Sequence, residues 1–269
     1  CGVGELILHA ISRGIRNFII RIGGSATNDG GVGMLKALGY RFLDEKGEDV
    51  GEGGQALARI ASVEISDKKE LLSQCNFRIA CDVTNPLCGE HGCSAVFGPQ
   101  KGATPTMIDQ MDHWLSGYAA LAGKKYPKAD PCHAGAGAAG GLGFAFLTFL
   151  NATLESGIQI VLDETHLSDH IKKADIVITG EGCLDGQTVM GKAPIGVAGI
   201  AKSFGKPVIA FSGCVTQEAY TCNAAGIDAF FPIQRGAVSL ADAMNKKNAA
   251  ENLCDTVEQV FRLIRTFSV

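Results

Sequence analysis

The residues best suited to chemistry lie in one glycine-rich stretch, residues 179–192 (TGEGCLDGQTVMGK). It holds two carboxylates, Glu181 and Asp185, and it ends with Lys192. The apolar run before it predicts a buried strand at residues 175–179, and Pro194 predicts the first turn of a helix after it. Glycines let backbone N–H groups approach an anion, and a helix N-terminus favours negative charge. The stretch therefore predicts an anionic, phosphate-bearing ligand in a loop at the carboxyl end of a strand.

Two further acids also follow predicted strands. A strand at residues 17–22 leads into the glycine-rich loop 23–31 (GGSATNDGG), which carries Asp29 and precedes a helix from about Val32. A strand at residues 77–81 ends at Asp82. Acids in such loops are often turn formers and helix caps, but at a strand end they can also hold magnesium through water. The residue pattern alone leaves both interpretations open.

The elements that would position these residues alternate regularly in the second part of the chain. Strands are predicted at residues 175–179, 207–212 and 227–233, with helices ending near residues 204 and 225 and a long helix from Ser239 to about residue 267. This β-α-β-α-β-α order predicts a parallel, three-layer α/β sheet. Since parallel sheets are usually covered on both faces and larger than three strands, partner strands are expected from a segment preceding Cys1.

Composition excludes several other classes of protein. The formal net charge is −4, and no basic tract indicates binding to nucleic acid. The densest apolar run, residues 144–150, is far shorter than the roughly 20 residues that span a bilayer. The 10 cysteines form no C-x-x-C pair, which favours free thiols in a reducing cytoplasm.

A further glycine-rich stretch, residues 135–143 (GAGAAGGLG), contains a G-x-G-x-x-G match. No strand runs into it and no acid follows at the position a dinucleotide site needs, so we reject a dinucleotide site. Tight backbone packing near a ligand or a helix is predicted instead. Cys88, His91 and Cys93 are interpreted as part of a glycine-rich loop rather than a metal cluster.

Several of these motifs together resemble the bacterial glycerate kinase type-1 family. The resemblance is carried, in this order, by residues 23–31, 80–87 (ACDVTNPL), 97–103 (FGPQKGA), 135–143 and 179–194. It implies ATP-dependent phosphorylation of D-glycerate, with magnesium, to phosphoglycerate, usually the 2-phospho isomer. From this resemblance together with the composition described above, we expect a cytoplasmic enzyme without nucleic-acid or membrane partners, for which a homodimer is permitted.

The resemblance further implies an α/β protein of two domains. One is a flavodoxin-like parallel sheet built from both ends of the full chain, and the other is an inserted α/β domain that resembles a restriction-enzyme fold. On this map residues 1–156 form the inserted domain and residues 157–269 the C-terminal part of the flavodoxin-like domain. The family's N-terminal segment is absent here, so the chain is expected to be a fragment.

Roles for the site residues follow from this resemblance and the needs of phosphoryl transfer. Asp185 is the first candidate to accept the alcohol proton or to bind magnesium, Glu181 is the second, and Lys192 would bind a phosphate or the glycerate carboxylate. Asp29 and Asp82 are the predicted magnesium ligands. The predicted substrate-binding residues are Ser25, Thr27, Asn28, Asp29, Asp82, Thr84, Gly180, Gly182, Gln187 and Thr188. A non-catalytic module that binds a hydroxy acid is the alternative function.

Overall fold

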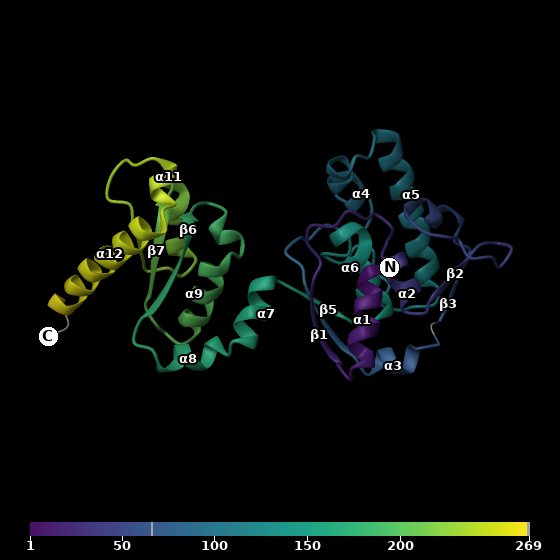
Figure 1. Cartoon of the computed structure of the whole chain (residues 1–269), viewed down its shortest axis with the longest axis horizontal. Coiled ribbons are helices and arrows are strands. Elements are labelled where there is room, and N and C mark those ends of the chain that lie inside the picture. The colour runs from purple at the N-terminus through teal and green to yellow at the C-terminus, as the bar shows by residue number, and fades with distance from the viewer. Residues whose placement is uncertain (66, 268–269) are drawn as a thin grey trace. The chain divides into compact units, whose positions relative to one another are not determined.

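A computed structural model describes residues 1–65 and 67–267, and the chain divides into two compact units, Cys1–Gly157 and Ile158–Val269. Both units are drawn in Figure 1. The elements of the first unit are α1 (Gly2–Ser12), β1 (Asn17–Arg21), α2 (Val32–Ala37), β2 (Arg41–Leu43), η1 (Gly54–Arg59), β3 (Ser62–Glu64), α3 (Lys69–Ser73), β4 (Asn76–Ala80), α4 (Cys93–Phe97), η2 (Pro99–Lys101), α5 (Pro105–Gly123), α6 (Ala138–Phe149) and β5 (Thr153–Glu155). Then follow α7 (Gly157–Glu164), α8 (Leu167–Lys173), β6 (Val177–Leu184), η3 (Thr188–Met190), α9 (Ala193–Ser203), β7 (Val208–Val215), η4 (Gln217–Tyr220), α10 (Thr221–Ala224), β8 (Ala229–Pro232), α11 (Leu240–Ala243) and α12 (Lys246–Phe267).

The first unit is built on a parallel sheet with the strand order β1-β4-β5. Arg21 at the end of β1 pairs with Ala80 at the end of β4, and Ala80 pairs with Glu155 at the end of β5. The strands predicted at residues 17–22 and 77–81 are therefore confirmed as β1 and β4. Because the strands are parallel and end together, the loops that follow β1 and β4 leave the same edge of the sheet.

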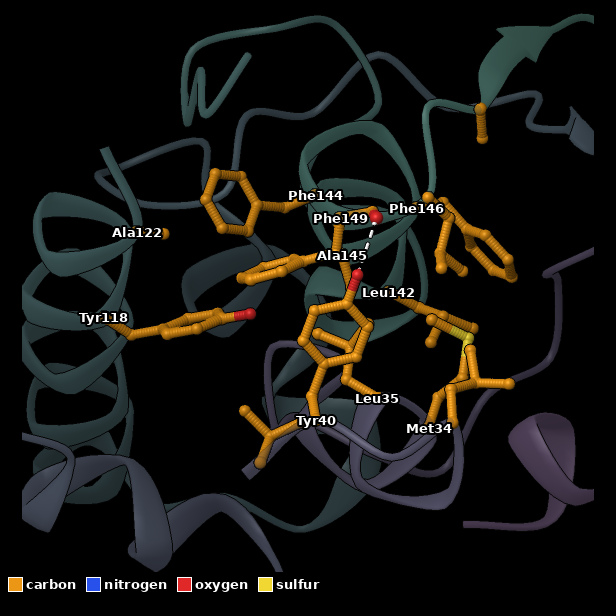
Figure 2. Close-up of a cluster of buried hydrophobic side chains, with 14 of the residues drawn as sticks. Met34, Leu35, Tyr40, Tyr118, Ala122, Leu142, Phe144, Ala145, Phe146 and Phe149 are labelled. Atoms are coloured by element: carbon orange, nitrogen blue, oxygen red, sulfur yellow. Dashed lines mark hydrogen bonds between the residues drawn. The ribbon is translucent and has the colours of Figure 1, made fainter. Parts of the chain in front are cut away.

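Aromatic side chains fill the core of the first unit (Figure 2). The ring of Tyr118 meets the rings of Phe144 and Phe149, with centroids 5.5 and 6.3 Å away. The hydroxyl of Tyr40 donates a 2.9 Å hydrogen bond to the carbonyl oxygen of Phe149, shown dashed in Figure 2. Burial raises the pKa of Tyr40 to about 12, so the hydroxyl keeps its proton and remains a donor. Burial of each such ring contributes about 1.5–3 kcal/mol to the free energy of unfolding.

The loop of residues 23–31 rests directly on the kinked start of α6. Residues Ala139, Gly140 and Gly141 have φ angles of 55°, 69° and 91°, which break the regular helix at this point. The amide of Gly30 donates a 2.9 Å hydrogen bond to the carbonyl oxygen of Gly140. A Cβ atom on Gly140 would lie 2.1 Å from the carbonyl oxygen of Thr27. The glycine-rich stretch 135–143 thus serves close backbone packing, as its sequence predicts.

The second unit contains a parallel sheet with the order β6-β7-β8 and helices on both faces. In Figure 1, α9 and α12 lie on opposite sides of β6 and β7. Val208 and Ala210 of β7 belong to the apolar cluster that contains α9, whereas Ile209 and Phe211 pack with Val260 of α12. The predicted parallel, three-layer arrangement is confirmed. Within the part of the chain that the structure describes, no helix is long and apolar enough to span a bilayer.

Two helix predictions in this unit need correction. The helix predicted from Ser239 to residue 267 is broken into α11 and α12, because Asn245 interrupts it. Its side-chain oxygen accepts from the amides of Lys247 (3.0 Å) and Asn248 (3.3 Å), the usual contacts of a helix N-cap. The helix predicted up to residue 225 is likewise only η4 and α10. Thr104 and Ser239 are N-caps of α5 and α11, since Thr104 Oγ1 accepts from the amide of Met107 and Ser239 Oγ from that of Asp242.

Replacing a glycine at the loop–helix contact should destabilise the protein, whereas a glycine on an open helix face should tolerate the same change. We expect Gly140→Ala to lower the free energy of unfolding by about 2–4 kcal/mol through left-handed strain and a clash with backbone atoms. Gly117→Ala in α5 is the matched control, because a Cβ there meets nothing within 4 Å. It should raise stability by about 0.5–1 kcal/mol through helix propensity. Urea unfolding midpoints measure both; equal midpoints for the two variants would contradict the packing account.

Candidate functional site

The glycine-rich loop of the first unit uses its acid to cap a helix. Asp29 Oδ1 accepts hydrogen bonds from Thr27 Oγ1 (2.8 Å) and the amide of Gly31 (3.1 Å). Asp29 Oδ2 accepts from the amide of Gly33 at 3.0 Å, in the first turn of α2. Both carboxylate oxygens are thus directed at groups of the loop and the helix start. This geometry favours the capping interpretation of Asp29, and its role as a magnesium ligand stays a prediction; the Thr27 hydroxyl is engaged in the same cap.

Asn28 anchors the loop to the interior of the unit. Its Nδ2 donates to Ser94 Oγ at 2.9 Å and lies 3.3 Å from Met111 Sδ. Ser94 is fully buried, and Asn28 Oδ1 is a buried acceptor without a partner among the described residues. The amide therefore contacts α4 and α5 rather than the cavity described next.

A cavity of about 240 Å³ lies at the carboxyl ends of β1 and β4. It is lined by Arg21, Ile22, Gly23, Gly24, Ser25, Ala80, Cys81, Asp82, Val83, Phe97, Gln100, Lys101, Ala138 and Ala139. Of the predicted site residues, Ser25 and Asp82 belong to this lining, and Thr84 is exposed outside it. Asp82 Oδ1 accepts a 2.8 Å hydrogen bond from the amide of Gly157, the first residue of α7.

Two cationic side chains line this cavity that were not among the predicted site residues. Lys101 Nζ donates to Ser25 Oγ at 3.2 Å and to the carbonyl oxygen of Thr27 at 2.5 Å. Burial lowers the pKa of Lys101, which the carboxylate of Asp29 partly offsets from a distance. Arg21 is the other cation in the lining. Lys101 lies in the stretch 97–103 that carries part of the family resemblance, but nothing in the local pattern indicates which distant loop its side chain reaches.

In the second unit the structure corrects the extent of β6. Residues 180–184, predicted as a loop, continue the strand, and Glu181 and Cys183 pair in register with Ser212 and Cys214 of β7. The glycines allow this pairing at close range, since a Cβ atom on Gly180 would lie 2.3 Å from the carbonyl oxygen of Phe211. Gly180 and Gly182, predicted to bind substrate from a loop, are therefore strand residues.

Beyond β6 the predicted acids and lysine meet in one hydrogen-bonded cluster. Asp185 Oδ1 accepts from the amides of Gln187 (2.9 Å) and Thr188 (3.0 Å), which closes a tight turn. The same oxygen accepts from Lys192 Nζ at 3.1 Å. Thr188 is buried, and its hydroxyl donates to Glu181 Oε1 at 2.5 Å. The structure thus brings together four predicted residues, Glu181, Asp185, Thr188 and Lys192; Gln187 contributes its backbone amide.

The charges of this cluster stabilise one another. The hydrogen bond from Lys192 is the largest cause that lowers the pKa of Asp185, and Asp185 in turn raises the pKa of Lys192. Both groups are therefore charged at neutral pH. A carboxylate with a lowered pKa is a weaker base than an ordinary one, so the geometry by itself favours charge placement, and the proton-acceptor role of Asp185 stays a prediction.

The cysteines near these sites do not have the character of nucleophiles or metal ligands. Burial, followed by the neighbouring Cys214, raises the pKa of Cys183 to about 11, and burial raises that of Cys93 to about 12. Thiols with such pKa values are protonated at neutral pH. Across residues 1–65 and 67–267, no group of three or more His, Cys, Asp or Glu side chains is placed to hold a metal ion. Cys88, His91 and Cys93 accordingly form no such group.

In both units, acids and lysines lie at the carboxyl ends of parallel strands. Ligands of α/β proteins bind at this edge of the sheet, so the fold and the sites indicate an α/β protein that binds small anionic ligands. Comparison with known proteins makes the class specific: the sequence profile of the glycerate kinase family matches residues 1–265. The chain belongs to the glycerate kinase family, and it is therefore an enzyme of the phosphotransferase type with an alcohol acceptor.

Named relatives cover most of the chain. Glycerate kinase of Haemophilus influenzae is 50% identical over 263 residues, which are 98% of this chain and 69% of the relative. Glycerate kinase of Bacillus subtilis is 47% identical over 264 residues, with the same coverage of 98% and 69%. Glycerate 2-kinase of Escherichia coli is 46% identical over 253 residues, 94% of this chain and 66% of the relative. The chain thus spans about two thirds of the length of these relatives.

A solved structure of a related protein has a similar fold. The crystal structure of a protein described as glycerate kinase 2 from Salmonella typhimurium LT2 matches with a TM-score of 0.83 at 48% identity. The match covers 98% of this chain and 68% of the other. The mixed α/β architecture with parallel sheets is thereby shared with that protein.

Removing Lys192 should raise the pKa of Asp185. The folded-state pKa of Asp185 is lowered, so its contribution to stability is present above the ordinary pKa of about 3.9 and is lost as the pH falls through the folded value. In Lys192→Met we expect the pKa of Asp185 to move toward the ordinary value, with Lys202→Met, which removes the partner of Asp228, as the control. Carboxyl ¹³C NMR titration measures it. An unchanged Asp185 pKa would show that the ion pair does not form in solution.

Proposed function

We propose that this protein transfers a phosphoryl group from ATP to a hydroxyl of D-glycerate and forms 2-phosphoglycerate. The relatives are named glycerate kinases, and one is named glycerate 2-kinase. The observation that carries the proposal is the cluster of Glu181, Asp185, Thr188 and Lys192 at the carboxyl end of β6. Phosphoryl transfer requires positioning, neutralisation of charge on the moving group and an acceptor for the alcohol proton. The cluster offers carboxylates and an ammonium in a fixed arrangement.

Each residue of the cluster then has a defined role. A carboxylate, Asp185 or Glu181, accepts the proton of the attacking hydroxyl as the new O–P bond forms and the bond to ADP breaks. Thr188 holds Glu181 through its hydroxyl, and the Asp185 turn orients Lys192. The ammonium of Lys192 neutralises negative charge on the transferred group. ADP leaves with the electron pair of the broken bond.

Magnesium would neutralise the nucleotide phosphates when it is bound. Of the two predicted ligands, Asp29 is the less available, because both of its carboxylate oxygens already accept hydrogen bonds within the loop and α2. Asp82 fits better, since its exposed side chain lines the cavity at a strand end. Magnesium is commonly held by one or two carboxylates with waters and substrate phosphates.

The proposal also includes the division of the chain into two domains, its cellular location and its assembly. We assign residues 1–156 to the inserted domain and residues 157–269 to the flavodoxin-like domain, in support of which the compact units divide after Gly157. A cytoplasmic location and assembly as a homodimer are proposed on the family resemblance; the free cysteines agree with a reducing compartment. The alternative, a module that only binds a hydroxy acid, is not favoured, because the named relatives are kinases.

Neutralising the catalytic carboxylate should remove most of the activity. We expect Asp185→Asn to lower the turnover number about 10²-fold or more, the usual effect of losing a general base. Asparagine keeps the side-chain oxygen that closes the turn, so the fold should persist. Release of ADP with D-glycerate and ATP measures the rate, and ³¹P NMR identifies the phosphorylated position.

Two variants make this experiment decisive. Asp228→Asn is the control, because Asp228 also pairs with a lysine, Lys202, but lies just before β8, away from the carboxyl ends of the strands. Near-normal turnover of Asp185→Asn with a large loss in Glu181→Gln would transfer the proton-acceptor role to Glu181. Binding of D-glycerate to the wild-type protein without ADP release would favour the binding module.

A further inference from the structure

The cavity of the first unit contains a cation, Lys101, that forms no ion pair with a carboxylate of the described residues. Some charged side chains of the unit form ion pairs, such as Lys36 with Asp49 and Arg41 with Glu64. Lys101 has no carboxylate within 4.0 Å among the described residues, and its two acceptors, Ser25 Oγ and the Thr27 carbonyl, are neutral. Lys101 is partly buried, and partial loss of hydration makes an ammonium less favourable unless an opposite charge is close. A ligand that brings this charge would therefore be stabilised here.

The remaining polar groups of the cavity restrict the ligand. Arg21 and Asp82 both lie in the lining, Arg21 at the end of β1 and Asp82 just beyond the end of the neighbouring strand β4. The lining thus offers cations for an anionic group and a carboxylate that can accept from a hydroxyl. The volume of about 240 Å³ is below the roughly 300–1,000 Å³ of pockets for drug-sized ligands. A small hydroxy acid fits these properties better than a nucleotide does.

We propose that Lys101 is the counter-ion of the substrate carboxylate and the residue that selects a hydroxy acid over a neutral polyol. The inference rests on the proposed function for the identity of the substrate, D-glycerate. Lys101 also connects η2 to the loop of residues 23–31, so an arriving carboxylate meets a cation already fixed by that loop. Arg21 supplies the second positive charge at the same strand end.

Substitutions that separate charge from tethering test this proposal. Lys101→Gln keeps a hydrogen-bond donor but loses the charge, Lys101→Met loses both, and Lys101→Arg keeps the charge. We expect the dissociation constant of D-glycerate, measured by calorimetry, to rise about 10- to 100-fold in the Gln and Met variants alike, the effect of losing a charge-assisted hydrogen bond. The Arg variant should stay closer to the wild type, and the KM for ATP should not change in any of them.

Lys125→Met is the matched control, because Lys125 also donates from a partly buried ammonium to a backbone carbonyl, that of Val63 at 2.9 Å, outside the cavity lining. D-glycerate affinity should remain at the wild-type value in this variant. Wild-type affinity in Lys101→Gln with a loss only in Lys101→Met would overturn the proposal and leave Lys101 as a tether. An equal rise in the constants for D-glycerate and ATP would overturn it as well.

The outcomes also separate this proposal from the proposed function. If the wild-type protein binds D-glycerate through Lys101 but releases no ADP, the counter-ion role stands and the kinase activity fails. If the wild-type protein is an active kinase and Lys101→Gln binds D-glycerate normally, the kinase stands and the counter-ion role fails. A wild-type protein that neither binds D-glycerate nor releases ADP overturns both.

Discussion

The arrangement of the first unit depends on direct contact between two glycine-rich backbones. The loop of residues 23–31 lies against Gly140 and Gly141 so closely that a Cβ atom on Gly141 would be 2.7 Å from the Cα of Gly30. Side chains cannot enter this interface, and the backbones are joined by the hydrogen bond between Gly30 and Gly140. The contact holds the loop of residues 23–31 in place. That loop carries the cap of α2, Asp29, and both acceptors of Lys101, Ser25 Oγ and the Thr27 carbonyl oxygen.

The local elements could largely be predicted from the sequence. Apolar runs located β1, β4, β7 and β8. The predicted C-terminal end of β6 was wrong, because glycine has a low intrinsic preference for strands and the loop prediction relied on that preference. Pairing with β7 decides its conformation, and this pairing needs the small residues. The break at Asn245 was detectable in principle, since asparagine is a preferred N-cap.

The candidate sites could also be predicted only in part. The acids at strand ends were predicted because they follow apolar runs, but the pattern could not show which groups would donate hydrogen bonds to their carboxylate oxygens. The carboxylate oxygens of Asp29 accept hydrogen bonds from amides of its own loop and helix, whereas Asp185 accepts from the amides of a turn and from Lys192. Lys101 was missed because its partners are about 75 positions earlier in the chain. Such a contact depends on how the backbones pack and leaves no periodic trace in the sequence.

The position of the cations at the cavity also bears on how an anion arrives. The chain as a whole carries a formal net charge of −4, which at long range repels anionic ligands. At physiological ionic strength charges are screened beyond about 8 Å, so an approaching anion responds to the nearest side chains rather than to the sum. The cavity lining places the cations Arg21 and Lys101 beside a single acid, Asp82. For the proposed substrate carboxylate these few residues at one sheet edge set the local attraction, and added salt would slow its capture despite the acidic character of the whole chain.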